Sequence, residues 1–147
     1  MDAVAESEPT ENRIGTAIVA SAMAVHSALG PGLLEHTYEL CLAYELGKRA
    51  LCARKQVSLP LRYGDLLVED AYRIDLLIDG LVVIEVKAVE AILPVHRGQL
   101  LSYLRLGGYR LGYLLNFNVA HMRDGITRRA NGLPSTAATA KPPRPLR

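Results

Sequence analysis

The chain has 147 residues, half of them hydrophobic, and a net charge of +2 at pH 7. This length is enough for one domain with a proper core, and no apolar run approaches the roughly 18 residues of a membrane span. The N-terminal residues are acidic and lack the basic start of a signal peptide. Cys41 and Cys52 form no Cys-x-x-Cys pair, which favours reduced thiols over a disulfide or a zinc site. We therefore expect a cytoplasmic protein with no membrane association.

The two ends of the chain differ from its centre in composition. Residues 1–11 contain acidic but no basic residues, and residues 134–147 contain basic but no acidic residues, with several prolines. We expect a flexible acidic extension over 1–11, a single folded domain over 12–133 and a disordered tail over 134–147. The central segment has a mild excess of basic residues, which permits phosphate binding.

Helices and strands follow one another in a clear order along the central segment. Apolar residues at helical spacing predict helices over 11–29 and 33–50, separated by Gly30-Pro31-Gly32. An alternating pattern predicts a strand over 56–63, in which Pro60 indicates an edge position or an interruption. Further on, the patterns predict a helix and two strand segments, over residues 94–106, 109–117 and 122–129.

The most informative segment lies in the middle of the chain. Residues 72–78 and 81–86 are nearly continuous apolar runs joined by Asp-Gly, which indicates two buried strands in a hairpin. Asp75, Glu85 and Lys87 are set into or directly after these runs, where a charge is costly unless it is compensated. Two carboxylates can hold a hard divalent cation, and a lysine can assist an attacking water or a phosphate. A salt-bridged hairpin explains the three charges equally well.

The register of this hairpin decides whether Asp75 and Glu85 can act together. A two-residue loop at Asp79-Gly80 would place the two carboxylates on opposite faces of the sheet. A three-residue loop with a bulge at the glycine would pair Leu77 with Leu81. Glu85 would then lie diagonally beside Asp75 on one face, roughly 7–8 Å away at the backbone. A shared metal site therefore predicts the bulged loop. Because carboxylates crowded in an empty metal site repel one another, we also expect at least one raised pKa among these acids and Glu35.

Two helical patterns add polar residues to this picture. Glu35 and Tyr38, three residues apart, share a face at the start of the second predicted helix, although the helix dipole alone favours a glutamate there. Gln99 and Tyr103 share a face of the third helix in the same way. Each pair is compatible with an ordinary contact on a helix surface, or with a role in positioning water or phosphate.

Taken in order, these patterns resemble the PD-(D/E)XK nuclease superfamily, and more narrowly the bacterial GxxExxY family. The resemblance covers about residues 14–129. Three groups of residues match the family's motifs: Gly32, Glu35 and Tyr38; Asp75 with Glu85-Val86-Lys87; and Gln99 with Tyr103 in the third helix. The segments 116–118 and 124–126 are also similar to the closing part of that family. The proline that usually precedes the aspartate is replaced by Ile74.

This resemblance implies a three-layer, restriction-endonuclease-like α/β core, in which a mixed sheet is flanked by helices in the order α-α-β-β-β-α-β-β. It also implies DNA cleavage that depends on Mg²⁺ or Mn²⁺. The implied metal ligands are the side chains of Asp75, Glu85 and Glu35 and the carbonyl of Val86. Lys87 would orient the water and offset charge, and Gln99 would fix Lys87 or the water. The implied substrate contacts are Tyr38 and Tyr103.

Two other functions are compatible with the same sequence. One is a catalytically silent nucleic-acid-binding or accessory subunit of the same fold, which the small size favours and the intact Asp75, Glu85 and Lys87 oppose. The other is an interaction protein whose apolar helices form a dimer face. A homodimer would also be compatible with nuclease activity.

Overall fold

The computed structural model describes residues 7–134, and the expectations for residues 1–6 and 135–147 lie outside this range. Nine elements follow in order: α1 (Thr10–Leu29), α2 (Glu35–Lys48), β1 (Ala53–Tyr63), β2 (Leu66–Ile78), β3 (Val82–Lys87), α3 (Pro94–Gly107), β4 (Leu111–Asn116), the short 3₁₀ helix η1 (Met122–Gly125) and β5 (Ile126–Ala130). This order confirms the predicted arrangement of two helices, three strands, one helix and two strands. None of the helices in the described range is long and apolar enough to cross a membrane.

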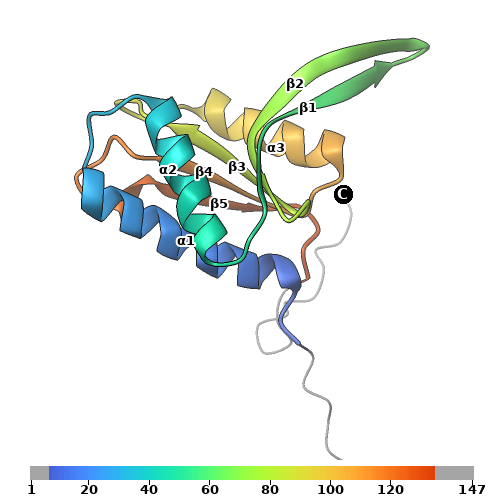
Figure 1. Cartoon of the computed structure of the whole chain (residues 1–147). Coiled ribbons are helices and arrows are strands. Elements are labelled where there is room, and N and C mark those ends of the chain that lie inside the picture. Colours follow the sequence, from blue (N-terminus) through green and yellow to red (C-terminus); the bar gives the residue numbers. More distant parts are fainter. Residues whose placement is uncertain (1–6, 135–147) are drawn as a thin grey trace, which may run out of the picture.

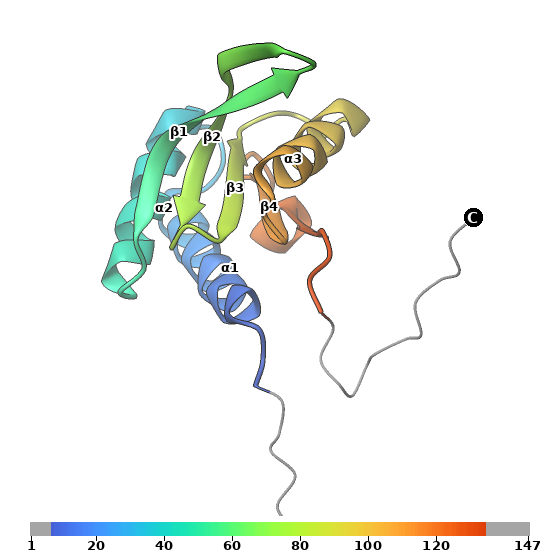
Figure 2. The same cartoon turned by 90° about the vertical axis from the view of Figure 1, so that its right-hand side faces the viewer.

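The five strands form one mixed sheet in the order β1-β2-β3-β4-β5. Neighbouring strands are antiparallel except β3 and β4, which are parallel. A parallel pair needs a crossover connection, and α3 supplies it. Helices α1 and α2 cover one face of the sheet and α3 covers the other (Figures 1 and 2). The fold is therefore the predicted three-layer α/β arrangement.

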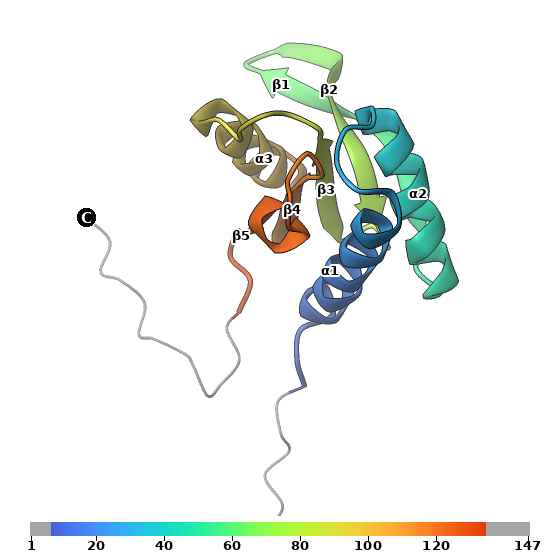
Figure 3. The same ribbon diagram turned by 90° about the vertical axis from the view of Figure 1, so that its left-hand side faces the viewer.

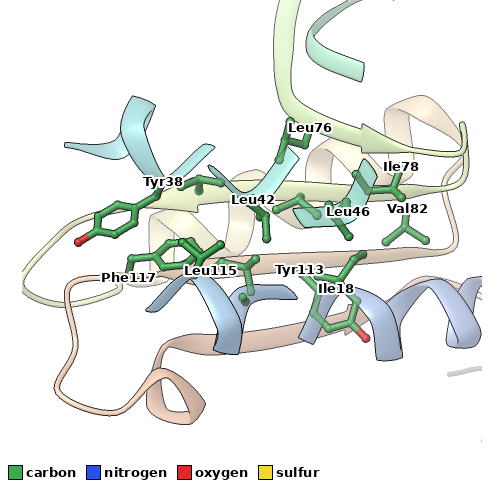
Figure 4. Close-up of a cluster of buried hydrophobic side chains, with 14 of the residues drawn as sticks. Ile18, Tyr38, Leu42, Leu46, Leu76, Ile78, Val82, Tyr113, Leu115 and Phe117 are labelled. Atoms are coloured by element: carbon green, nitrogen blue, oxygen red, sulfur yellow. The ribbon is translucent and has the colours of Figure 1, made fainter. Parts of the chain in front are cut away.

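Apolar side chains fill both spaces between the helices and the sheet. Val82, Ile84 and Val86 of β3 belong to the cluster beneath α1 and α2, whereas Val83 belongs to the cluster beneath α3. Figure 4 shows the larger cluster, in which side chains of α1 and α2 meet those of β2, β3 and β4. Burial on both faces explains why the sequence of β3 is almost continuously apolar.

Helix α1 begins slightly before the expected start of the domain at residue 12. Glu11, in the first turn, is 4% exposed, and its carboxylate accepts hydrogen bonds from Arg110 Nε and a terminal guanidinium nitrogen at 2.6 and 2.9 Å. The guanidinium group lowers the pKa of Glu11. This ion pair ties the start of α1 to the residue that precedes β4, so residues 10 and 11 belong to the folded domain.

Strands β1 and β2 are longer than expected and extend beyond the sheet. Their outer part, residues 58–70, is called the arm here, and it projects away from the helices and the other strands (Figure 1). The sequence did not indicate a strand over 66–71, because residues 66–70 are exposed and the segment shows no alternation of apolar and polar residues. Between Leu59 and Leu61 of β1 the register shifts, at the expected interruption around Pro60.

The loop of the β2–β3 hairpin has the expected length at a shifted position. Ile78 pairs with Val82, so residues 79–81 form the loop. The expected pairing of Leu77 with Leu81 is therefore wrong. The reason is that Asp79 and Gly80 form the turn, with left-handed φ of 51° and 68°, and the N–H of Leu81 closes it by donating to the Ile78 carbonyl at 2.9 Å. Leu81 is therefore an extra residue before the ladder resumes at Val82.

Candidate functional site

Asp75 and Glu85 lie where β2 separates from β3. The last pair of the ladder is Leu76 with Ile84, and the same register brings Asp75 directly opposite Glu85. Asp75 Oδ2 accepts a hydrogen bond from the backbone N–H of Val86 at 2.8 Å. Glu85 Oε1 in turn accepts one from the backbone N–H of Asp75 at 3.3 Å. We call this place the fork. At the fork, the two carboxylates accept hydrogen bonds that backbone carbonyl groups would accept if the ladder between β2 and β3 continued.

Glu85 is a buried acid at the fork. Its side chain is 4% exposed. Burial raises the pKa of Glu85 to about 9, with the charge of Asp75 as the second cause, while the positive charge of Lys87 lowers it. The expectation of a raised pKa among the clustered acids is confirmed, although burial contributes more than the repulsion between carboxylates. A carboxyl group with this pKa is protonated at neutral pH until a cation arrives.

Three further residues predicted for the site come from β3 and α3, namely Lys87, Gln99 and Tyr103. Lys87 is half-buried and shares a face of β3 with Glu85. Gln99 Nε2 donates to the hydroxyl of Tyr103 at 2.7 Å, so in this structure Gln99 positions Tyr103. The Tyr103 ring stacks on Tyr72 with 4.8 Å between centroids. Burial, followed by the charge of Glu85, raises the pKa of Tyr103, and the charge of Asp75 adds to this effect.

Glu35 reaches the same end of β3 from α2. It is the first residue of the helix, and its Oε1 accepts a hydrogen bond from the backbone N–H of Ala88 at 3.2 Å. Ala88 directly follows Lys87. Glu35 therefore lies beside the end of β3, bound to backbone, and does not form a three-carboxylate cluster with Asp75 and Glu85.

Tyr38 is fully buried and has no exposed surface for a substrate. Its ring stacks on Phe117 at 4.6 Å between centroids. Its hydroxyl donates to the carbonyl of Gly30 at 2.6 Å and accepts from the N–H of Leu33 at 3.1 Å. Within this loop Gly32 has a φ of 101°, which strongly favours glycine. Tyr38 thus holds the loop that leads into Glu35.

Three polar residues at the site were assigned no role from the sequence, although segment 116–118 is part of the family resemblance. Asn116, at the end of β4, accepts from the N–H and donates to the carbonyl of Val89, and thereby fixes the segment after Lys87. Glu39 is buried on α2, and Gln56 on β1 bridges Glu39 and Asp75. The only indication of Glu39 in the sequence is its position four residues after Glu35, which places both side chains on the same face of the helix.

The fork has the chemistry of a site for a hard divalent cation. Among residues 7–134, no three His, Cys, Asp or Glu side chains are placed to share a metal ion. The protein therefore offers two carboxylates, Asp75 and Glu85, and the adjacent backbone carbonyl of Val86. Oxygen donors of this kind suit Mg²⁺, which usually binds through one or two carboxylates and keeps several waters. The raised pKa of Glu85 indicates a buried acid that lacks positive charge, which a cation would supply.

Comparison with known protein families agrees with this geometry. A family model described as the PD-(D/E)XK nuclease superfamily matches residues 12–129. The chain belongs to the PD-(D/E)XK nuclease superfamily. No curated protein and no solved structure gives a significant match. Nucleases of the PD-(D/E)XK superfamily generally use divalent metal ions and act on nucleic acids, in accord with the two carboxylates and the lysine at the fork.

Proposed function

We propose that this protein is a nuclease that hydrolyses phosphodiester bonds of DNA with Mg²⁺ or Mn²⁺, and that it belongs to the GxxExxY family. The observation that carries the proposal is the direct opposition of Asp75 and Glu85 at the fork, with Lys87 on the same strand as Glu85. The family assignment is supported by the joint action of Gly32, Glu35 and Tyr38, which form and anchor one loop beside this site.

Each residue of the fork has a distinct role in this proposal. Asp75, Glu85 and the carbonyl of Val86 would hold the metal ion, and Glu35 would contact it through a water. When bound, the ion would activate water and neutralise charge on the phosphate. Lys87 orients the attacking water and offsets negative charge that develops in the transition state.

The residues of α3 and the loop support the substrate and the site. In our proposal the hydroxyl of Tyr103 contacts the substrate, and Gln99 keeps that hydroxyl in place through its hydrogen bond. Gln99 would thus act through Tyr103, whereas the resemblance implied that it fixes Lys87 or the water. Tyr38, which is buried, would act on Glu35 through the loop and would not touch the substrate.

The test is a cleavage assay with purified protein on linear, nicked and circular DNA and on RNA, with Mg²⁺, Mn²⁺ or a chelator. We expect metal-dependent cleavage by the wild type and none by Lys87→Ala. Binding of nucleic acid without cleavage under all of these conditions would favour the silent accessory subunit. Equal cleavage by wild type and Lys87→Ala would indicate a contaminating enzyme and contradict the proposed site.

We also propose that two copies associate through α1 and α2. The outer surface of these helices carries exposed apolar side chains, among them Leu29, Leu40 and Tyr44, at 40%, 41% and 69% exposure. These residues line a hollow of about 310 Å³. Helices α1 and α2 lie side by side on one face of the sheet (Figure 3). Apolar surface of this kind is typical of an interface between proteins. The hollow is separate from the fork, so association would leave the proposed site open.

A further inference from the structure

Glu39 is a second glutamate of α2 that is directed toward the fork. It lies one helical turn after Glu35 and is 5% exposed. Such a buried carboxylate is costly unless a donor satisfies it. Gln56 Nε2 donates to Glu39 Oε1 at 2.8 Å. Burial raises the pKa of Glu39 and the charge of Asp75 adds to this effect, while the bond to Gln56 lowers it. Glu39 is therefore bound to β1 and close to Asp75.

Gln56 connects Glu39 to Asp75. The same Nε2 atom lies 3.5 Å from Asp75 Oδ1, the outer limit for a hydrogen bond. An amide nitrogen has two N–H groups, so one can serve each carboxylate. Because both neighbours are acceptors, the amide must present its nitrogen to them, and its orientation is fixed.

The backbone at Gln56 supports a specific role for this bridge. Lys55 pairs with Leu76 and Val57 pairs with Ile74, so Gln56 lies opposite Asp75. At this position the backbone has a φ of 53°, a left-handed conformation that is uncommon for residues other than glycine. Residues in such conformations concentrate at functional sites. The pairing register between β1 and β2 is the same before and after Gln56, so the left-handed conformation of this residue does not shift β1 relative to β2.

Together these contacts hold both carboxylate oxygens of Asp75. Oδ2 accepts from the N–H of Val86 at 2.8 Å, and Oδ1 faces the amide of Gln56. A carboxylate oxygen has two lone pairs, so each oxygen keeps one for a cation. A neutral amide also leaves the negative charge of Asp75 intact, whereas a lysine at position 56 would neutralise it.

We propose that Glu39 and Gln56 are positioning residues for Asp75: Glu39 anchors the amide of Gln56, and the amide orients the Asp75 carboxylate for a divalent cation at the fork. This inference rests on the proposed metal-dependent function and names two residues that act through Asp75 without touching the metal ion.

The test is Mn²⁺ binding, followed by the electron paramagnetic resonance signal of the free ion, in wild type, Glu39→Met, Gln56→Met and the double variant. Methionine removes the polar groups and retains an unbranched side chain of similar length. We expect each single variant to raise the dissociation constant about tenfold or more, as loss of an outer-shell partner does at other metal sites. Because both residues act in one chain of contacts, the double variant should bind no more weakly than Gln56→Met.

Three controls separate positioning from stability and from charge. Melting temperatures in chelator report the structural cost of each variant. Glu45→Met removes a glutamate from the same helix that is paired with Lys48 and Arg49, and it should leave Mn²⁺ affinity unchanged. Glu39→Gln keeps an acceptor for the amide, and its affinity should be closer to wild type than to Glu39→Met. Because Gln56 is exposed, Gln56→Met preserves the test even if Glu39→Met fails to fold.

Each outcome decides the inference. Unchanged affinity in both single variants, with any loss confined to the melting temperature, overturns it and leaves the metal site intact. Additive losses in the double variant also overturn it, because the residues would then act separately. Absence of Mn²⁺ binding in the wild type would overturn the proposed function itself, which makes the two failures distinguishable.

Discussion

Glu85 is the residue whose ionisation depends most on its surroundings. In the metal-free protein its pKa is about 9, against 4.5 for a free glutamate, because it is buried beside Asp75. The folded chain therefore binds one more proton than the unfolded chain between these pH values. The contribution of Glu85 to the free energy of unfolding is therefore fully present below about pH 4 and is lost as the pH rises toward 9.

This difference predicts how Glu85→Gln alters stability with pH. In chelator, the variant should match the wild type near pH 5 and become more stable than it near pH 8. The advantage should grow by on the order of 1 kcal/mol per pH unit, because glutamine cannot ionise. Urea denaturation at several pH values measures it. A constant difference between the two proteins from about pH 5 to 8 would mean that Glu85 titrates normally.

Asp75→Asn separates the metal role of Asp75 from its structural role. An asparagine oxygen can still accept from the N–H of Val86, which alanine cannot, and its nitrogen would replace only the long 3.5 Å contact with the Gln56 amide. The fold should therefore retain most of its stability in chelator. The variant should lose the rise in melting temperature that Mg²⁺ gives the wild type, because binding to the folded state alone is stabilising. Thermal melts with and without Mg²⁺ test this. An equal Mg²⁺ response in both proteins would place the metal ion elsewhere.

At the residue scale the sequence could predict only part of the site. Asp75, Glu85 and Lys87 stand out because charges are rare within buried strands. Glu39 and Gln56 do not stand out, because their contact depends on how α2 packs against β1 and on a left-handed residue in that strand. No local pattern encodes either property.

The contact between α3 and the sheet depends on a glycine. Gly112 of β4 lies beneath α3, and a Cβ atom there would come within 2.9 Å of side-chain carbons of Leu100 and Leu104 and within 3.3 Å of the Val83 carbonyl oxygen. Both leucines are buried, so they have little room to move. Gly112 therefore sets the distance between α3, which carries Gln99 and Tyr103, and the fork.

Two glycine substitutions should change stability in opposite directions. Gly112→Val should destabilise the domain by about 1–3 kcal/mol despite the strand preference of valine, because overpacking forces the helix outward. Gly98→Ala, in α3 itself with open space around it, should stabilise by about 0.5–1 kcal/mol. Chemical denaturation measures both values. A neutral Gly112→Val would show that α3 packs loosely on the sheet.

At the element scale the predictions were best where burial was strong. The helices and the inner strands have periodic or continuous apolar patterns, and their order and type were predicted. The arm, residues 58–70, was only partly predicted, because its strands pair with each other outside the core and are exposed on most positions. Strands that pair with each other without being buried need no regular pattern of hydrophobic residues, so the sequence gives little indication of them.

Within residues 7–134, the polar fork and the apolar surface on α1 and α2 are two distinct features of the molecule. The fork draws side chains from α2, β1, β2, β3 and α3, so it requires the complete three-layer fold. The apolar surface requires only the two helices. Helix α2 therefore contributes to both, with Glu35 and Glu39 on the side of the fork and Leu40 and Tyr44 at the hollow.

A pair of tyrosine substitutions tests that association. Tyr44, on α2, is 69% exposed and lies at the hollow, whereas Tyr63, on the arm, is 79% exposed. Tyr44→Glu should shift the protein from dimer to monomer in analytical ultracentrifugation, because it places a charge in an apolar interface. Tyr63→Glu, the matched control, should remain dimeric. A wild type that is monomeric at all concentrations would contradict the proposed dimer.

The central claim is that the fork binds a divalent metal ion, and anomalous scattering from Mn²⁺ in crystals of the protein tests it most directly. We predict one strong peak within coordination distance of Asp75 and Glu85 in the wild type, and its loss in Asp75→Asn. A peak bound to other residues, or none at saturating Mn²⁺ in a well-ordered crystal, would contradict the account.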